Sequence, residues 1–230
     1  MQVIAYCILH YGRPYLRRAL EAIAPQVDKI VIIYTSTPSQ GHATELTCPD
    51  TRDQLKEIAD SFGDKVLWIE GSYRHEGEHC EAVMPYTAGF DYLVRFDSDE
   101  IYPEGAVAHY IAQAEHTTAK IFRLPFIHFW KTPDTRVNAD GQHPDRLIKL
   151  NTSEEGGVYL DSDNEKYSIL HFGYAQPTEY IIYKMSIHGH KSEWREEWLQ
   201  DKWLGNDTTD LHPVSRDFWN AVPFNGVGGR

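Results

Sequence analysis

Strand-like and helical patterns alternate over the first 70 residues, and this alternation constrains the fold more than any other feature of the sequence. The runs 2–9, 29–34 and 65–69 are apolar and rich in β-favouring residues. Between them, the segments 14–25 and 55–63 repeat apolar residues at helical spacing and end at proline or glycine. The pattern predicts an α/β fold in which helices cover both faces of a parallel sheet.

A fourth strand-like run, 92–96, leads into the acidic sequence Asp97-Ser98-Asp99-Glu100. Sheets of this kind bind ligands beyond the carboxyl ends of their strands. We therefore expect a ligand site near the loops that follow the first four strands, after Leu9, Tyr34, Ile69 and Phe96.

The pattern changes after residue 120. Residues 121–130 and 146–150 are predicted strands, and 158–160 and 168–172 are predicted shorter ones, at a mixed or antiparallel edge of the same sheet. Further helices are expected over 103–115, 177–188 and 192–203.

The net charge of -12 argues against a general basic surface for nucleic acid. Three widely spaced cysteines give no disulfide framework. No apolar stretch reaches the ~20 residues that span a bilayer, and the chain starts directly with a strand-like run. We therefore expect a soluble cytoplasmic protein without a signal peptide.

Asp97 and Asp99 are the most informative polar residues. Two carboxylates at the end of a buried strand can direct oxygen ligands at Mg²⁺ or Mn²⁺. Such an ion would bridge the phosphates of a nucleotide diphosphate and neutralise charge on the leaving group. The alternative is a solvated acidic turn in which Asp99 caps the next helix.

Residues 1–115 resemble the nucleotide-binding half of GT-A glycosyltransferases, particularly family-2-like members, through VIAYCILH, KIVIIYTS, VLWIEG and the DXD motif in DYLVRFDSDEI. Downstream, HFGY followed by Lys184 and HGH resembles the HxGY…K…GH stretch of related transferases. The resemblance implies one GT-A domain over 1–230, Rossmann-like with a mixed central sheet. Residues 1–115 would bind the nucleotide sugar, and 116–230 would bind the acceptor and carry a C-terminal helical segment.

The resemblance also implies a metal-dependent hexosyl- or pentosyltransferase whose donor is a nucleotide-diphosphate sugar, with a UDP-sugar expected first. The acceptor hydroxyl would belong to a glycan, a lipid-linked sugar or a modified viral DNA base, and a modified base is the one role foreseen for nucleic acid. The cell would be bacterial or virus-infected. Stereochemical outcome and oligomeric state are left open.

The predicted metal ligands for Mn²⁺ or Mg²⁺ are Asp97, Asp99 and His171, the histidine through the resemblance. Asp163 and Asp145 are the preferred candidates for a general base, ahead of Asp161 and Glu165. Arg13 would meet a phosphate at a helix start. The predicted contacts to the nucleotide sugar are Tyr6, His10, Arg13, Thr35, Asp97, Lys184 and His190.

Three other functions stay open. HEGEH satisfies the spacing of a zinc metalloprotease through His75, Glu76 and His79, although Gly77 weakens a helix there. A nucleotidyltransferase is disfavoured because HYGRPY, rather than a glycine-rich loop, follows the first strand. A non-catalytic module that binds a nucleotide or sugar is the third. For most C-terminal aromatic residues we expect core packing.

Overall fold

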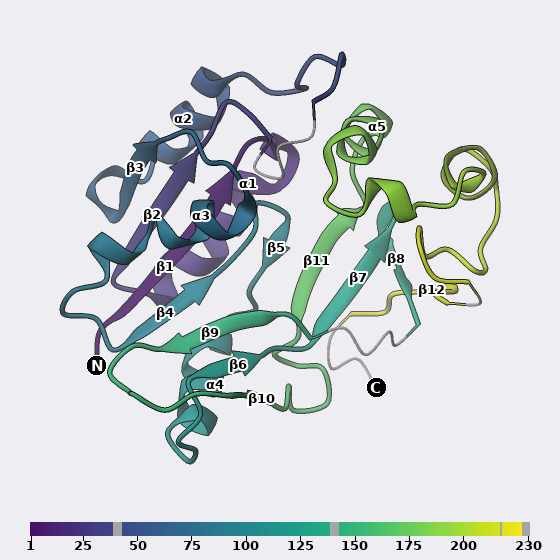
Figure 1. Cartoon of the computed structure of the whole chain (residues 1–230). Helices are drawn as coiled ribbons and strands as arrows, with labels where there is room; N and C mark the ends of the chain where they lie inside the picture. Colours follow the sequence, from purple (N-terminus) through teal and green to yellow (C-terminus); the bar gives the residue numbers. More distant parts are fainter. Residues whose placement is uncertain (39–42, 139–142, 217, 227–230) are drawn as a thin grey trace.

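The computed structural model describes residues 1–38, 43–138, 143–216 and 218–226, and Figure 1 shows two sheets that meet along one side. Within these residues, the first sheet has seven strands in the order β10-β6-β9-β4-β1-β2-β3. Strands β1 to β4 are parallel, and β9 runs antiparallel to both β4 and β6. Their bounds are β1 Val3–Leu9, β2 Lys29–Tyr34, β3 Val66–Glu70, β4 Tyr92–Arg95, β6 Ile121–Arg123, β9 Asp145–Lys149 and β10 Gly157–Tyr159.

Helices cover both faces of this sheet because alternate residues of β1 point to opposite sides. Val3, Ala5 and Cys7 pack in one core with α1, α2 and α4, while Ile4 and Tyr6 pack in another beside α3. The helices are α1 Arg13–Ile23, α2 Arg52–Asp60, α3 Glu76–Glu81 and α4 Ala106–Ala114. Short 3-10 turns lie at Ala24–Gln26, Gly63–Lys65 and Met84–Tyr86.

A second sheet stands beside the first and has the order β12-β8-β7-β11-β5 among the described residues. Its bounds are β5 Glu100–Ile101, β7 Phe126–Trp130, β8 Thr132–Val137, β11 Ile169–Tyr174 and β12 Ala221–Pro223. Helix α5, Thr178–Ile187, packs on it with a buried tryptophan cluster of Trp130, Trp198, Trp203 and Trp219. The expectation that the C-terminal strands extend the edge of the first sheet is therefore only partly correct.

The boundary between the sheets also divides the segment 121–130. Strand β6 ends at Arg123 in the first sheet, and β7 starts at Phe126 in the second. Pro125 lies at the crossing; its ring leaves no N–H for a ladder, while its carbonyl accepts a bond from the Ile169 N–H at 2.9 Å. One predicted strand is thus two strands of different sheets.

The helix expected over 192–203 is not continuous. A 3-10 turn at Lys191–Glu193 ends at Trp194, whose ψ of 137° is extended, and a π turn follows at Leu199–Trp203. The rings of Trp198 and Trp203 stack with centroids 6.3 Å apart. Residues five apart face the same side in a π turn, so burial of both indoles favours this geometry over an α-helix.

The other predicted elements are found with small shifts of their bounds: α5 covers most of 177–188, and α4 starts after Pro103. The fold class is confirmed as α/β with a mixed central sheet. In the part of the chain that the structure describes, no helix has the length and apolar character to cross a membrane.

Candidate functional site

A cavity of about 1060 Å³ opens where the carboxyl ends of β1 and β4 face the second sheet. The turn 96–99 carries the chain from β4 into β5, so the acidic motif lies at the junction of the two sheets. The predicted site residues that line this cavity are His10, Asp97, Asp99, Asp145, His171, Lys184 and His190.

Asp99 and His171 lie side by side in the cavity wall. The β5–β11 pairing aligns His171 with Glu100, and the Phe172 N–H donates to the Asp99 carbonyl at 2.8 Å. His171 Nε2 is then 3.8 Å from Asp99 Oδ1, and Gln176 donates to Asp99 Oδ2 at 2.9 Å. Backbone pairing between the strands therefore places a carboxylate and an imidazole next to each other.

The electrostatic environment keeps His171 neutral. Burial, followed by the positive charge of Lys184, lowers the pKa of His171 to about 3. Burial raises the pKa of Asp99, and the Lys184 ammonium opposes that change. The Lys184 Nζ lies 4.7 Å from the centre of the Tyr174 ring. At neutral pH the imidazole can offer a nitrogen lone pair beside the carboxylate and a lysine.

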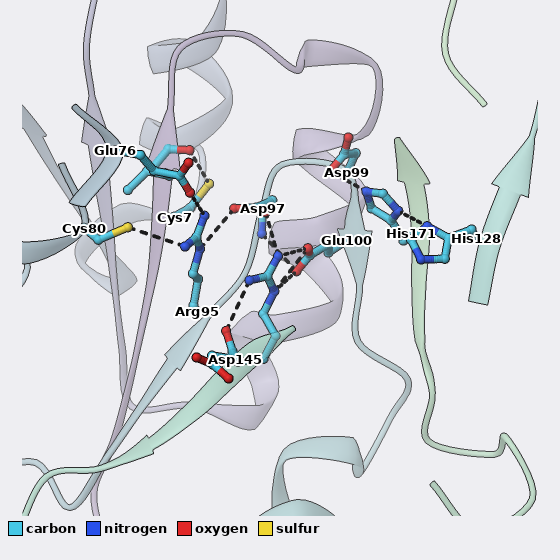
Figure 2. Close-up of polar contacts among 12 residues, drawn as sticks. Cys7, Glu76, Cys80, Arg95, Asp97, Asp99, Glu100, His128, Asp145 and His171 are labelled. Atoms are coloured by element: carbon cyan, nitrogen blue, oxygen red, sulfur yellow. Dashed lines mark hydrogen bonds and ion pairs between the residues drawn. The ribbon is translucent and has the colours of Figure 1, made fainter. Parts of the chain in front are cut away.

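Asp97 contacts arginines instead. Its Oδ1 faces Arg95 (Figure 2), whose Nε is 3.5 Å away, and its Oδ2 lies 2.8 Å from Arg146 Nη2. Burial disfavours the charged form of Asp97, but Arg146 and Arg95 outweigh it and hold the pKa of this carboxyl well below its usual range. Arg146 also binds Glu100 at 2.5 Å, and Arg95 binds Glu76 at 2.7 Å.

The structure therefore brings two of the three predicted metal ligands together and directs the third, Asp97, to Arg146 and Arg95. Among the described residues, no group of three or more His, Cys, Asp or Glu side chains forms a metal site by itself. Asp99 and His171 form a partial site that would need oxygen atoms from a ligand or from water to complete a coordination shell.

The start of α1, where Arg13 was expected to meet a phosphate, is filled by the chain itself. The N–H groups of Gly12 and Arg13 both donate to Asp50 Oδ2, at 2.7 and 2.9 Å. Arg13 Nε lies 3.3 Å from Asp50 Oδ1, and the Tyr180 hydroxyl donates to the same oxygen. A buried carboxylate thus occupies the anion position of this helix, and Arg13 does not line the cavity.

The other predicted nucleotide contacts divide into two groups. His10 lines the cavity, with Nδ1 2.9 Å from the Thr35 carbonyl and Nε2 2.7 Å from the Tyr183 hydroxyl. His190 lines it from an exposed position and pairs with Glu193 at 2.8 Å. Tyr6 and Thr35 are buried and do not line the cavity.

The two preferred base candidates are separated. Asp145 begins β9, lines the cavity and pairs with Arg123 at 3.0 Å, while its side chain stays 51% exposed. Asp163 lies in an exposed turn with a left-handed φ of 53° and does not line the cavity. Asp145 thus lies at the cavity and Asp163 outside it, and the role of either as a base stays a prediction.

The HEGEH motif does not form a zincin site. Helix α3 has six residues, and His75 is its cap, accepting the Glu78 N–H on Nδ1. His79 is buried and bonds through Nε2 to the Ile33 carbonyl at 2.7 Å, while Glu76 pairs with Arg95. Each proposed ligand or base has a structural partner, so the metalloprotease hypothesis is not favoured.

Several residues of the site escaped prediction. His128 bonds to His171, Gln176 bonds to Asp99, and Asp50 fills the start of α1. His128 and Gln176 are single polar residues in buried segments, with no spacing pattern that marks them. Their partners lie 43 and 77 positions away, so only the fold brings them together.

No protein-family model matches the chain, and no curated protein does. One similar solved structure is 4-diphosphocytidyl-2C-methyl-D-erythritol synthase from Anaerococcus prevotii, at 11% identity and a TM-score of 0.45, covering 79% of this chain and 95% of that one. A second is a fragment of TarS from S. aureus, at 10% identity and a TM-score of 0.48. This match covers 81% of this chain and 64% of that one. A third is a mannosyltransferase from Pyrobaculum calidifontis in complex with GDP-Man and Mn²⁺, at 13% identity and a TM-score of 0.43. This match covers 64% of this chain and 44% of that one.

This chain spans less than two thirds of the TarS and mannosyltransferase chains. The three TM-scores lie below 0.5, so the likeness concerns the path of the chain. What the chain does must be derived from its own side chains.

Proposed function

We propose that this chain is a glycosyltransferase that moves a sugar from a nucleotide-diphosphate sugar to an acceptor hydroxyl. One observation carries the proposal: a carboxylate oxygen and a neutral imidazole nitrogen lie 3.8 Å apart beside Lys184 in a cavity of about 1060 Å³. The cavity lies beyond the carboxyl ends of parallel strands and is large enough for a nucleotide sugar and an acceptor together.

Asp99 and His171 fit a divalent metal ion of the Mn²⁺ or Mg²⁺ type. Such ions are commonly held by one or two protein ligands plus phosphate oxygens, which matches a partial site of two. The His171 nitrogen is unprotonated at neutral pH, as a ligand must be. When bound, the ion would supply positive charge to the leaving diphosphate. Solved neighbours include structures with GDP-Man and Mn²⁺ and with UDP.

Other residues would divide the remaining tasks. Lys184 would bind the diphosphate through its positive charge. Ile8 and His10 line the end of the cavity that we propose for the nucleobase. Asp145 would accept the proton of the acceptor hydroxyl. The acceptor oxygen then forms a bond to the anomeric carbon, the bond from that carbon to the phosphate oxygen breaks, and the nucleoside diphosphate leaves. Asp97 would keep the turn in place through Arg146 and Arg95.

The first test is thermal unfolding with a panel of nucleoside diphosphates and nucleotide sugars, with and without Mn²⁺. A ligand at a hundredfold excess over its Kd stabilises by about 2.7 kcal/mol, which corresponds to roughly 5–10 °C for a chain of this size. We expect such a rise for one nucleotide in the presence of Mn²⁺, and its loss in Asp99→Asn. Asp163→Asn, an exposed carboxylate outside the cavity, is the matched control and should behave as the wild type.

Two results would contradict the proposal. The first is a wild-type Tm that no nucleotide raises with Mn²⁺. The second is a metal-dependent rise that Asp99→Asn retains in full, because this would place the metal elsewhere.

A further inference from the structure

His128 lies next to His171 on the neighbouring parallel strand. The β7–β11 register aligns the two residues directly, and their Nδ1 atoms are 2.6 Å apart (Figure 2). The rings are perpendicular, at 89°, with centroids 4.6 Å apart. His128 is 4% exposed, so its ring is part of the interior of the second sheet.

The close contact of the two nitrogens requires one to donate a hydrogen and the other to accept it. If His171 donates through Nδ1, its Nε2 keeps a lone pair directed towards Asp99. If His128 donates instead, His171 carries the hydrogen on Nε2, and the Asp99 oxygen at 3.8 Å lies beyond hydrogen-bond distance. The first arrangement leaves a lone pair facing a carboxylate oxygen, a combination that a cation between them stabilises.

The ring of His128 also contacts Trp219, at a centroid distance of 5.0 Å and an interplanar angle of 35°. Trp219 is buried and has a φ of 65°, which is strained for a bulky residue. Two hydrogen bonds hold the chain at this point: the Leu211 N–H donates to the Trp219 carbonyl, and the Asn220 N–H donates to the side-chain oxygen Oδ1 of Asn138. His128 is therefore packed against both a strained tryptophan and His171.

We propose that His128 is a positioning residue: it accepts the Nδ1–H of His171 and thereby fixes the tautomer and ring orientation with which His171, together with Asp99, binds a divalent cation. This inference rests on the proposed function, because it needs the cation. His128 acts through His171 and is not itself a ligand. Loss of such a partner typically weakens metal affinity about 10–100-fold.

The test measures Mn²⁺ affinity of the whole chain by electron paramagnetic resonance, without nucleotide. His128→Leu removes the hydrogen-bond acceptor, whereas His128→Asn keeps a carbonyl oxygen near the position of Nδ1. His109→Leu is the matched control, since His109 also stacks on an aromatic ring and bonds to a carbonyl, but lies on α4 outside the cavity. The Tm of each variant shows that it is folded.

We expect the Kd for Mn²⁺ to rise about 10–100-fold in His128→Leu and to stay near the wild-type value in His128→Asn and His109→Leu. Wild-type affinity in His128→Leu, or equal weakening in His128→Asn and His128→Leu, would overturn the inference, the latter because packing rather than the hydrogen bond would then matter. If the wild type binds no Mn²⁺, or if Asp99→Asn binds Mn²⁺ with the wild-type Kd, the proposed metal site is wrong. The inference about His128 is then wrong as well, because it depends on that site.

Discussion

Asp145 and Arg146 are neighbours in the sequence with opposite environments. Arg146 is buried and holds Asp97 and Glu100, while Asp145 remains half exposed at the edge of the cavity. Successive residues of a strand point to opposite sides, so β9 supplies both a buried structural cation and an accessible carboxylate. Because of this alternation, the Asp145 side chain is accessible to a substrate, whereas Asp97 and Glu100 are bound to Arg146.

At the residue scale we predict the effect of Asp145→Asn. An amide cannot accept the proton of a hydroxyl, so hydrolysis or transfer of the donor sugar should slow by about 10²–10⁴-fold. The Mn²⁺-dependent rise in Tm should persist, because Asp145 does not hold the diphosphate. The rate is measured as release of nucleoside diphosphate, with Asp161→Asn as an exposed control. An unchanged rate in Asp145→Asn would exclude it as the base.

Helix α1 shows how two distant elements are joined. The carboxylate of Asp50 accepts the N–H groups of Gly12, the cap of α1, and of Arg13, its first residue, and a hydrogen bond from Tyr180 on α5. A carboxylate is favourable at a helix N-terminus because the N–H groups there lack partners and the helix dipole is positive. Gly12 is needed beside this carboxylate for a separate reason: its φ is 132°, and a Cβ there would lie 1.9 Å from Ser98 Oγ.

At the element scale we predict that Asp50→Asn destabilises the fold by about 1.5–3 kcal/mol, the range for hydrogen bonds to a charged group. The amide keeps one acceptor oxygen but loses the charge that Arg13 and the helix terminus stabilise. Urea unfolding measures the change. Asp53→Asn is the control, an exposed acid in the first turn of α2, and should leave the midpoint nearly unchanged. Equal effects of the two substitutions would contradict this role of Asp50.

The sequence predicts a helix or strand where that element has a local pattern of apolar residues. The parallel strands β1 to β4, the acidic turn and α5 follow from local runs and were predicted. The second sheet was not predicted as a separate sheet. Its strand β5 has only two residues, and β8, with the sequence TPDTRV, lacks an alternation of apolar and polar residues. Asp99 and His171 were predicted to share a site, and their metal-binding role stays a prediction. Asp50 and His128 depend on partners 38 and 43 residues away, which no local pattern encodes.

At the scale of the whole molecule, the tryptophan cluster forms one of the buried cores that involve the second sheet. Trp198 is fully buried there, and its Nε1 donates to the Leu211 carbonyl at 2.7 Å. We predict that Trp198→Ala lowers the free energy of unfolding by about 3–5 kcal/mol, as for other buried aromatic residues. Urea denaturation is the measurement, and Leu204→Ala, half exposed, is the control. A loss no larger than that of Leu204→Ala would show that this cluster is not a core.

The turn from β4 to β5 places Asp99 on the segment that leaves the first sheet, whereas His171 belongs to the second. The β5–β11 pairing within the second sheet sets the separation of these two side chains. A ligand bound to both would therefore fasten the turn that leaves β4 of the first sheet to β11 of the second. Its binding free energy must be lost before either layer can separate from the other, so occupancy would protect the whole chain from unfolding and proteolysis rather than a single loop.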